Sequence, residues 1–367
     1  MTPSPPPTPP TPPTPPTPPT PPTPERSRAG RVAGAPVGPF SAFVVARTGD
    51  SIEAGVRRLA LADLPAGEVT LEVDWSVVNY KDGMVTRPGN RVARVDPLVP
   101  GVDLVGTVLA SDDPSFGVGQ EVVAHGYDLG VAHHGGFSER ARVPAAWVVP
   151  LPDHLTARRA AVIGTAGFTA ALSLRRLEDH GLRPGDGPVL VTGATGGVGS
   201  LAVSLLASRG YEVVASTGKP TEHGYLIGLG AAEVIDRAEL AGESHRTLGP
   251  ERWAGAVDCV GGAGLSAILR TLRYGAAVAA SGLTGGSTFE STVYPFIVRN
   301  ASLIGIDTVQ TPIEERRSVW AALAAAWPPL ALDDMVEGEV GLDQLGPALE
   351  RILAGGVRGR ILVRPAG

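Results

Sequence analysis

A glycine-rich turn between a strand and a helix constrains the fold of this chain more than any other feature. Val191–Ser200 reads Val-Thr-Gly-Ala-Thr-Gly-Gly-Val-Gly-Ser, after a short apolar strand at Pro188–Thr192 and before a helix whose apolar face carries Leu201, Leu205 and Leu206. Glycines let the backbone turn tightly and approach a pyrophosphate, and the free N–H groups of the helix N-terminus attract anions. This context predicts a dinucleotide site, the alternative being a structural tight turn.

Strands and helices alternate after this turn, whereas short strands dominate before it. The expected later elements are helices at Gly199–Gly210 and around Tyr225–Leu229, with strands at Tyr211–Ser216, Glu233–Asp236, Ala256–Val260 and Ala276–Ser281. The expected earlier strands are Phe43–Arg47, Glu68–Asn79, Asp103–Ala110 and Glu121–His125. We therefore predict an antiparallel barrel or sandwich, followed by a parallel sheet with helices on both faces. A last helix at Gln344–Ala354 and a strand at Arg360–Val363 are expected to return to the first domain.

The residues that follow the second strand of the parallel sheet indicate which nicotinamide cofactor is bound. An NAD site usually has Asp or Glu there, which binds the ribose 2′-hydroxyl. This chain has Ser216, Thr217, Gly218 and Lys219, and their hydroxyls and cation suit a 2′-phosphate. Glu222 lies close by and favours NADH. We expect NADPH, with NADH as the alternative.

A tyrosine in a turn of the first domain is the candidate catalytic residue. Tyr80 lies between Asn79 and Lys81, the only lysine besides Lys219. Hydride delivery to an electron-poor alkene creates an enolate, whose oxygen needs a hydrogen-bond donor, and a neutral phenol supplies one at neutral pH. The alternative is a tyrosine that only packs on a sheet at the end of a strand.

Composition excludes several classes of protein and site. The net charge of −6 argues against nucleic-acid or anionic-membrane partners, and no apolar run reaches the ~18 residues of a membrane helix. The single cysteine, Cys259, allows no internal disulfide, and no secretory signal is apparent, so we expect a cytoplasmic protein. His125, His133 and His134 have no cysteine partners, so we expect no metal site. No Gly-x-Ser-x-Gly motif indicates a hydrolase.

The N-terminus is a Pro/Thr repeat. From Thr2 to Pro24 the unit Thr-Pro-Pro recurs, and proline fixes φ and lacks a backbone donor, so this segment is expected to be disordered or polyproline II. A passive tail and a ligand for a proline-reading domain are the two interpretations, and the first is favoured.

Motifs spread from Ala42 to Pro365 resemble the medium-chain dehydrogenase/reductase superfamily, in particular its quinone-oxidoreductase branch and, within that, the acrylyl-CoA reductases (NADPH). Besides the glycine turn they are Trp75-Ser76, Asn79–Asp82, Pro100–Asp103, Gly135–Glu139, Ile163–Ala170, Trp253–Asp258, Gly282–Gly286 and Pro295–Asn300. The resemblance implies an α/β protein with a Rossmann doubly wound parallel sheet domain and a GroES-like β-barrel catalytic domain. The expected division is a tail at 1–30, the GroES-like domain at 31–162, the NADPH-binding domain at 163–298 and a C-terminal segment at 299–367 that completes the catalytic domain.

The same resemblance implies the site residues and the reaction. The residue matching Tyr80 lies beside the nicotinamide, and the pyrophosphate is held by those matching Thr195, Gly196, Gly197 and Val198. The adenosine phosphate is held by residues matching Thr217–Lys219, where Ser and Arg are more usual than Thr217 and Lys219. Positions matching Leu283, Ile297 and Thr308 approach the nicotinamide half.

The family reduces the C=C bond of acryloyl-CoA to propanoyl-CoA, with hydride going to the β-carbon, and a homodimer without zinc is expected. The alternatives are NADPH:quinone reduction in the same cleft and a non-catalytic NADPH-binding scaffold. A scaffold would not need the glycine turn, Lys219 and Tyr80 together. Fold alone does not decide between the two enzymatic readings.

Overall fold

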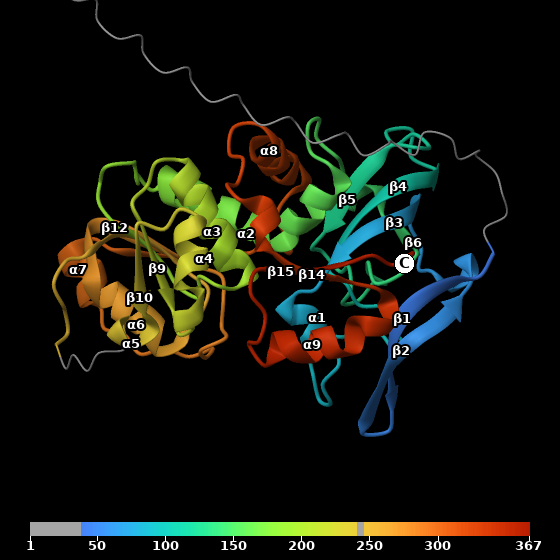
Figure 1. Cartoon of the computed structure of the whole chain (residues 1–367), viewed down its shortest axis with the longest axis horizontal. Helices are drawn as coiled ribbons and strands as arrows, with labels where there is room; N and C mark the ends of the chain where they lie inside the picture. The colour runs from blue at the N-terminus through green and yellow to red at the C-terminus, as the bar shows by residue number, and fades with distance from the viewer. Residues whose placement is uncertain (1–37, 241–245) are drawn as a thin grey trace, which may run out of the picture. The chain divides into compact units, whose positions relative to one another are not determined.

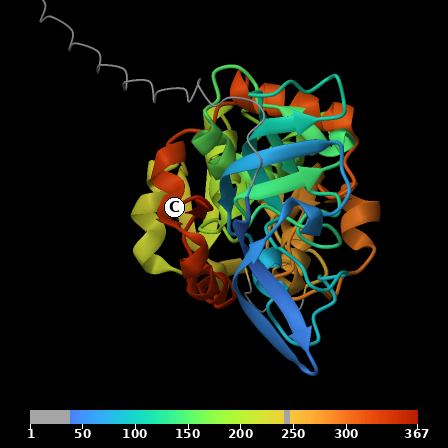
Figure 2. The same cartoon turned by 90° about the vertical axis from the view of Figure 1, so that its right-hand side faces the viewer.

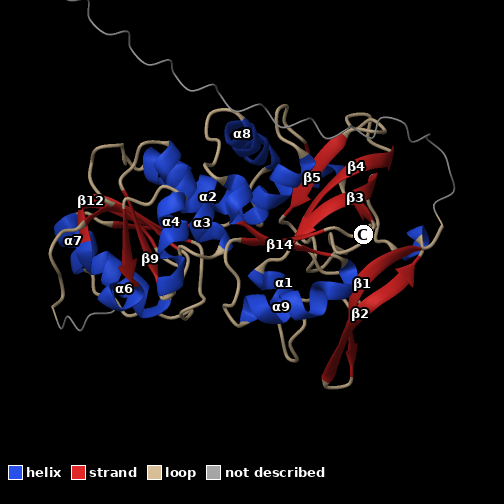
Figure 3. Ribbon diagram, in the orientation of Figure 1, coloured by secondary structure: helices blue, strands red, loops and turns tan. Residues whose placement is uncertain are grey.

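Two sheets and one long helix between them organise the part of the chain that the structure describes. The structure is a computed structural model, and it describes residues 38–240 and 246–367. The Pro/Thr segment expected to form a tail over 1–30 lies outside the described residues. Figures 1 and 3 show one sheet surrounded by helices on the left, around β9 and β12, and the other sheet on the right, with β3, β4 and β5. No helix in the described ranges is both long and apolar enough to cross a membrane.

The first sheet is parallel, in the order β10-β9-β8-β11-β12-β13. Its strands are β8 (Val189–Val191), β9 (Val213–Thr217), β10 (Glu233–Asp236), β11 (Trp253–Asp258), β12 (Leu272–Ala280) and β13 (Ser302–Gly305). Counted from β8, the order is 3-2-1-4-5-6, which is that of the Rossmann fold. All three residues of β8 are buried, as expected for a parallel strand covered on both faces. The predicted parallel sheet is therefore confirmed.

Short helices follow most of these strands. They are α3 (Gly197–Ser208), α4 (His223–Gly228), α5 (Arg237–Leu240), α6 (Gly262–Thr271), α7 (Tyr294–Arg299) and α8 (Ile313–Ala324). The sheet continues past residue 298, where we expected its domain to end, because β13 pairs in parallel with β12. We therefore propose a boundary after Gly305.

The second sheet is mainly antiparallel, in the order β14-β15-β3-β4-β5-β7, with β6 also paired to β3. Its strands are β3 (Val69–Val77), β4 (Asp103–Ser111), β5 (Glu121–His125), β6 (Arg140–Val143), β7 (Val148–Pro150), β14 (Val336–Val340) and β15 (Arg360–Val363). The C-terminal strand β15 enters this sheet antiparallel to β3, with Leu362 opposite Val77. Helix α9 (Leu345–Leu353) precedes β15 and packs near α1 (Tyr80–Met84). The separate ribbon of β1 (Phe40–Thr48) and β2 (Ser51–Leu59) extends from this region in Figures 1 and 2.

Helix α2 (Ala157–Asp179) joins the two sheets and was not predicted. It begins at Thr156, whose hydroxyl accepts a hydrogen bond from the Arg159 N–H at 3.3 Å. One continuous apolar core runs from barrel residues such as Val77 through α2 to residues of the parallel sheet such as Val257. The helix is kinked at Gly164, which has φ 46° and ψ −157°. Because α2 is buried on nearly every face, it lacks the one-sided apolar pattern by which a helix is recognised in a sequence.

Candidate functional site

The glycine turn lies where the sequence predicts it, between β8 and α3. Gly193 has φ 58°, a conformation that side chains disfavour, and Gly196 precedes the first turn of α3. A Cβ at Gly199 would lie 2.3 Å from the carbonyl oxygen of Gly193, so only glycine lets α3 approach the turn this closely. Thr195 is buried, and Gly196, Gly197 and Val198 are half-buried. The backbone N–H groups at the start of α3 therefore provide the anion-attracting end that a pyrophosphate requires.

The end of β9 lies beside this turn. The Ala194 N–H donates to the Ser216 carbonyl at 3.2 Å, and the Thr217 hydroxyl accepts from the Lys219 N–H at 3.1 Å. The buried Ser216 hydroxyl has no hydrogen-bond partner among the described residues. The Lys219 ammonium donates to the carbonyl of Val357 at 3.0 Å. The fold thus brings together the two groups of residues that the sequence assigns to the pyrophosphate and the adenosine phosphate.

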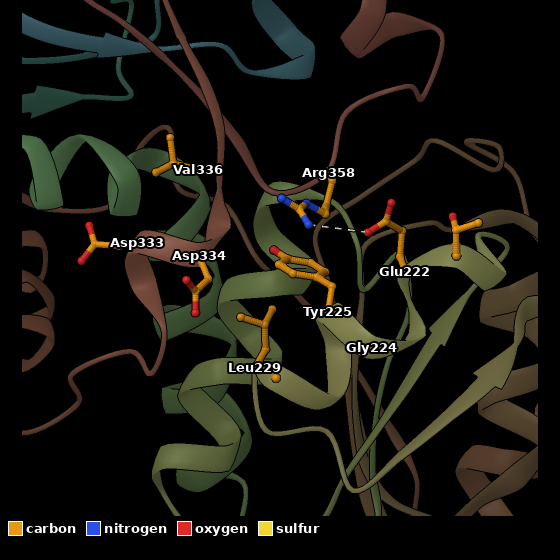
Figure 4. A pocket seen from close by; sticks show the side chains of 10 residues that line it. Glu222, Gly224, Tyr225, Leu229, Asp333, Asp334, Val336 and Arg358 are labelled. Atoms are coloured by element: carbon orange, nitrogen blue, oxygen red, sulfur yellow. Dashed lines mark ion pairs between the residues drawn. The ribbon is translucent and has the colours of Figure 1, made fainter.

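Glu222, the residue that favours NADH, is paired with an arginine from the C-terminal segment. Its carboxylate lies 3.9 Å from the guanidinium of Arg358, which also stacks 4.7 Å above the ring of Tyr225. Figure 4 shows Arg358 lying across that ring and directed toward Glu222. These three residues line a cavity of about 590 Å³ that Asp333 and Asp334 complete. Because Arg358 offsets the charge of Glu222, the argument for NADH is weakened.

Arg360 joins the glycine turn to the turn that carries Tyr80, and sequence reasoning missed it. Its guanidinium is buried, and a Cβ at Gly197 would lie 2.6 Å from Nη1, so the cation lies against the start of α3. Nη1 donates to the Asn79 side-chain oxygen at 3.2 Å, and Nε donates to the Val162 carbonyl at 3.0 Å. Nη2 is buried and has no partner among the described residues. Nη2 lies beside Gly164, whereas Nη1 faces the start of α3, so the guanidinium brings positive charge next to the glycine turn.

A buried carboxylate, Asp103, is linked to Arg360 through the side chain of Asn79. Asp103 accepts hydrogen bonds from the Thr165 N–H at 2.7 Å, the Thr165 hydroxyl at 2.8 Å and the Asn79 side-chain amide at 2.7 Å. Its pKa is raised by burial, and the positive charge of Arg360 acts in the opposite direction. The kink at Gly164 frees the Thr165 N–H from the helix, and it leaves no space for a side chain between Asp103 and Arg360. Three segments distant in sequence therefore meet at one polar network.

Tyr80 is the first residue of α1, and its side chain is 38% exposed. Its hydroxyl makes no hydrogen bond to any described residue. The turn before it is fixed by Asp82, which accepts from the N–H groups of Asn79 at 2.8 Å, Gly101 at 3.1 Å and Val102 at 3.0 Å. Burial raises the pKa of Asp82 to about 7, with these N–H groups acting against that rise. The phenol is therefore partly exposed on a turn held by backbone hydrogen bonds, and its catalytic role stays a prediction.

The predicted residues of the nicotinamide half are further apart. Leu283 follows β12 and Ile297 lies in α7, where its side chain is 72% exposed. Thr308 is half-buried, and its carbonyl accepts from Arg316 Nη2 at 3.1 Å. Among the described residues, no hydrogen bond joins these three to Tyr80 or to the glycine turn. Their role remains a prediction.

The described residues do not fit a zinc site. No group of three or more His, Cys, Asp or Glu side chains is arranged to hold a metal within 38–240 and 246–367. Cys259 directly follows β11, where desolvation raises the pKa of its thiol to about 12, and zinc binds the thiolate. His125 instead accepts a hydrogen bond from Trp320 Nε1 at 2.9 Å, and burial holds its pKa well below the usual value.

Two protein-family models match the chain. Residues 65–153 match the alcohol dehydrogenase GroES-like domain, and residues 197–325 match the family described as zinc-binding dehydrogenase. The first range contains β3 to β7 of the antiparallel sheet, and the second contains β9 to β13 of the parallel sheet with helices α3 to α8.

Several known proteins are similar along nearly their whole length. YhfP of Bacillus subtilis, named as a quinone oxidoreductase, is 47% identical over 89% of this chain and 98% of its own. Its crystal structure, with NAD bound, matches with a TM-score of 0.87. The acrylyl-CoA reductase AcuI of Ruegeria pomeroyi is 48% identical over 88% of this chain and 98% of its own. The yhdH oxidoreductase of Salmonella enterica, in complex with NADP, matches with a TM-score of 0.85 at 44% identity, covering 88% and 99% of the two chains.

Proposed function

The chain belongs to the medium-chain dehydrogenase/reductase superfamily, and on that premise we propose that it is an NADPH-dependent reductase of the C=C bond of an α,β-unsaturated acyl-CoA. The observation that carries the proposal is the exposed, unbonded hydroxyl of Tyr80 on a turn linked through Arg360 to the glycine turn. The proposed substrate is acryloyl-CoA and the product propanoyl-CoA.

The polar groups around the glycine turn suit NADPH. The N-terminus of α3 would hold the pyrophosphate, with the cation of Arg360 beside it, and Thr217 and Lys219 would hold the 2′-phosphate. The pairing of Glu222 with Arg358 removes an uncompensated negative charge from the neighbourhood of that phosphate. The yhdH relative was crystallised with NADP and the YhfP relative with NAD, so the relatives alone do not decide between the two cofactors. The polar groups of this chain at Thr217, Lys219 and Arg358 are the reason for choosing NADPH. When bound, the cofactor supplies the hydride.

Tyr80 would stabilise the charge that develops on the thioester oxygen. A fixed donor aimed at a developing oxyanion lowers the barrier more than it strengthens substrate binding. Asp82 and Asn79 hold the turn from both sides, so the phenol needs little reorganisation before the reaction. The phenol thus donates a hydrogen bond to the enolate oxygen, and the α-carbon then takes a proton from water.

Positive charge near Tyr80 favours a CoA thioester over a quinone. Lys81 follows Tyr80, and Arg87 and Arg91 lie on the loop that continues from α1. All three side chains are exposed and form no ion pair with a described residue. The loop is shaped by Asn90, whose side-chain oxygen accepts from two backbone N–H groups. Phosphates of CoA would find cations here, whereas a quinone has no group that needs them.

The test is NADPH oxidation by the purified protein with acryloyl-CoA and a simple quinone in parallel, and with NADH as the cofactor control. Fast turnover with acryloyl-CoA alone is the expected result. Preference for the quinone would establish the second candidate, which the 47% identity to YhfP favours. Inactivity with both acceptors would contradict the proposed reaction.

We also propose a homodimer formed through the edge of the parallel sheet. β13 is the last strand of that sheet. Exposed apolar side chains gather in and around α7 and on β13, and we call them the α7 patch: Val293, Tyr294, Phe296, Ile297, Val298 and Leu303. An open strand edge beside an apolar surface supports association with a second copy.

A further inference from the structure

Arg237 stands at the same edge of the parallel sheet as the predicted 2′-phosphate residues. β10 pairs in parallel with β9, with Asp236 opposite Thr217. Arg237 directly follows β10, and Gly218 directly follows β9. The carboxyl ends of neighbouring parallel strands meet at one edge, so the pairing brings Arg237 beside Gly218.

The side chain of Arg237 lies against the backbone of Gly218. A Cβ at Gly218 would be 2.5 Å from Arg237 Nε and 2.8 Å from Cζ. The φ of Gly218 lies outside the left-handed region, so the turn itself does not require glycine there. Glycine instead leaves the space that the guanidinium occupies. The absence of a side chain at Gly218, after β9, therefore makes room for the side chain of Arg237, after β10.

Arg237 has no partner in the described part of the chain. It forms no ion pair or side-chain hydrogen bond there, and its acidic neighbours bind backbone groups. Asp236 accepts from the Ala238 N–H at 2.7 Å, and Glu239 accepts from the Asp236 N–H at 3.2 Å. Lys219, by contrast, already donates to the Val357 carbonyl. The guanidinium thus keeps its donors available beside the predicted phosphate position.

We propose that Arg237 binds the 2′-phosphate of the cofactor together with Lys219, and that this pair of cations sets the preference for NADPH over NADH. The inference rests on the proposed function, which supplies the cofactor. Lys219 acts as a compact charge held by Val357, and Arg237 adds a planar donor group from the other strand. The sequence does not single out Arg237, because it follows the next strand and nearly every basic residue of the chain is arginine.

The test compares the dissociation constants of NADPH and NADH for the wild type, Arg237→Leu and Arg237→Lys, measured from the fluorescence of the bound nicotinamide. Arg159→Leu is the matched control, because Arg159 is exposed and has no ion pair in the described ranges. We expect Arg237→Leu to weaken NADPH about 10- to 100-fold, the usual range for a hydrogen bond to a charged group. NADH should change less than about twofold, Arg237→Lys should recover part of the loss, and Arg159→Leu should bind both cofactors like the wild type.

Displacement of bound NADPH by 2′,5′-ADP and by 5′-ADP, followed through the nicotinamide fluorescence, provides a second readout that needs no substrate. The Arg237→Leu variant should lose affinity for the first compound alone. Equal losses for NADPH and NADH would overturn the inference and indicate stacking on the adenine, and unchanged affinities would overturn it as well. If the wild type binds NADPH but the Arg237 variants do not show the expected change in affinity, the inference about Arg237 fails and the proposed function stands. A wild type that does not bind NADPH would contradict the proposed function itself.

Discussion

Tyr80 is the residue on which the proposed chemistry depends most. Replacing it by Phe keeps the ring and removes the one group that could donate to an enolate oxygen. We expect Tyr80→Phe to lower kcat with acryloyl-CoA by about 100-fold, with the KM for NADPH nearly unchanged, because the lost contact belongs to the transition state. Tyr274→Phe is the control, since Tyr274 is exposed on β12. Equal kcat values for wild type and Tyr80→Phe would assign Tyr80 to packing.

The residues around the site divide into those that a motif marks and those that only the fold brings in. The glycine turn and Lys219 could be located because strand, turn and helix follow one another in the sequence. Arg358 and Arg360 could not, because they lie more than a hundred residues later, on a segment that reaches the turn through the pairing of β15 with β3 and through the hydrogen bond from the Gly359 N–H to the Thr195 carbonyl at 2.9 Å. Glu222 is an example. By itself it favours NADH, but the ion pair with Arg358 offsets its charge and weakens that argument.

At the scale of elements, the fit between α3 and the glycine turn depends on a close approach of two backbones. A methyl group at Gly199 would meet backbone atoms of Gly193 and Ala194, which cannot move aside as a side chain can. We expect Gly199→Ala to lower the free energy of unfolding by about 1–3 kcal/mol, the usual effect of overpacking, and to weaken NADPH binding. Urea denaturation and cofactor titration measure the two effects.

The control for Gly199→Ala is Gly264→Ala. Both glycines are the third residue of their helix, and a Cβ at Gly264 would meet no atom within 4 Å. Alanine there should be neutral or stabilise by up to about 1 kcal/mol, because it reduces the freedom of the unfolded chain. Equal effects of the two substitutions would mean that the close approach of α3 is not what glycine is needed for.

Helix α2 shows why one element escaped prediction. Its middle, Ile163–Ala170, is recognisable as a motif, but apolar residues surround the helix and Gly164 interrupts it. The interruption has a tertiary cause, because the kink turns the Thr165 N–H toward Asp103 of the other sheet. An alternation of apolar and polar residues with helical spacing identifies a helix that has one face in solvent. Helix α2 has no such face, because it lies between two sheets.

At the scale of the whole molecule, short strands with turns predict the antiparallel sheet, and alternation of strands and helices predicts the parallel one. The edge strands of these sheets determine where a second copy could bind. The apolar strands and turn signals predict both sheets, but the membership of β13 depends on its pairing with β12 and not on its composition. This pairing leaves β13 at the edge of the sheet, next to the α7 patch. A homodimer through this edge is therefore the arrangement that would cover the patch.

The homodimer is tested by placing one charge on the α7 patch. Val298 is 52% exposed in α7, and Val118 is 56% exposed on the loop before β5, so Val298→Asp and Val118→Asp alter valines of similar exposure, the first inside the patch and the second outside it. We expect the wild type and Val118→Asp to sediment at twice the mass of the chain, and Val298→Asp as a folded monomer, because a buried unpaired carboxylate strongly disfavours an interface.

A monomeric wild type would contradict the homodimer, and a Val298→Asp dimer would move the interface away from the patch. Because Ile297, a predicted nicotinamide neighbour, adjoins Val298, a monomer that also loses activity with unchanged NADPH affinity would indicate that the second copy shapes the substrate side of the site.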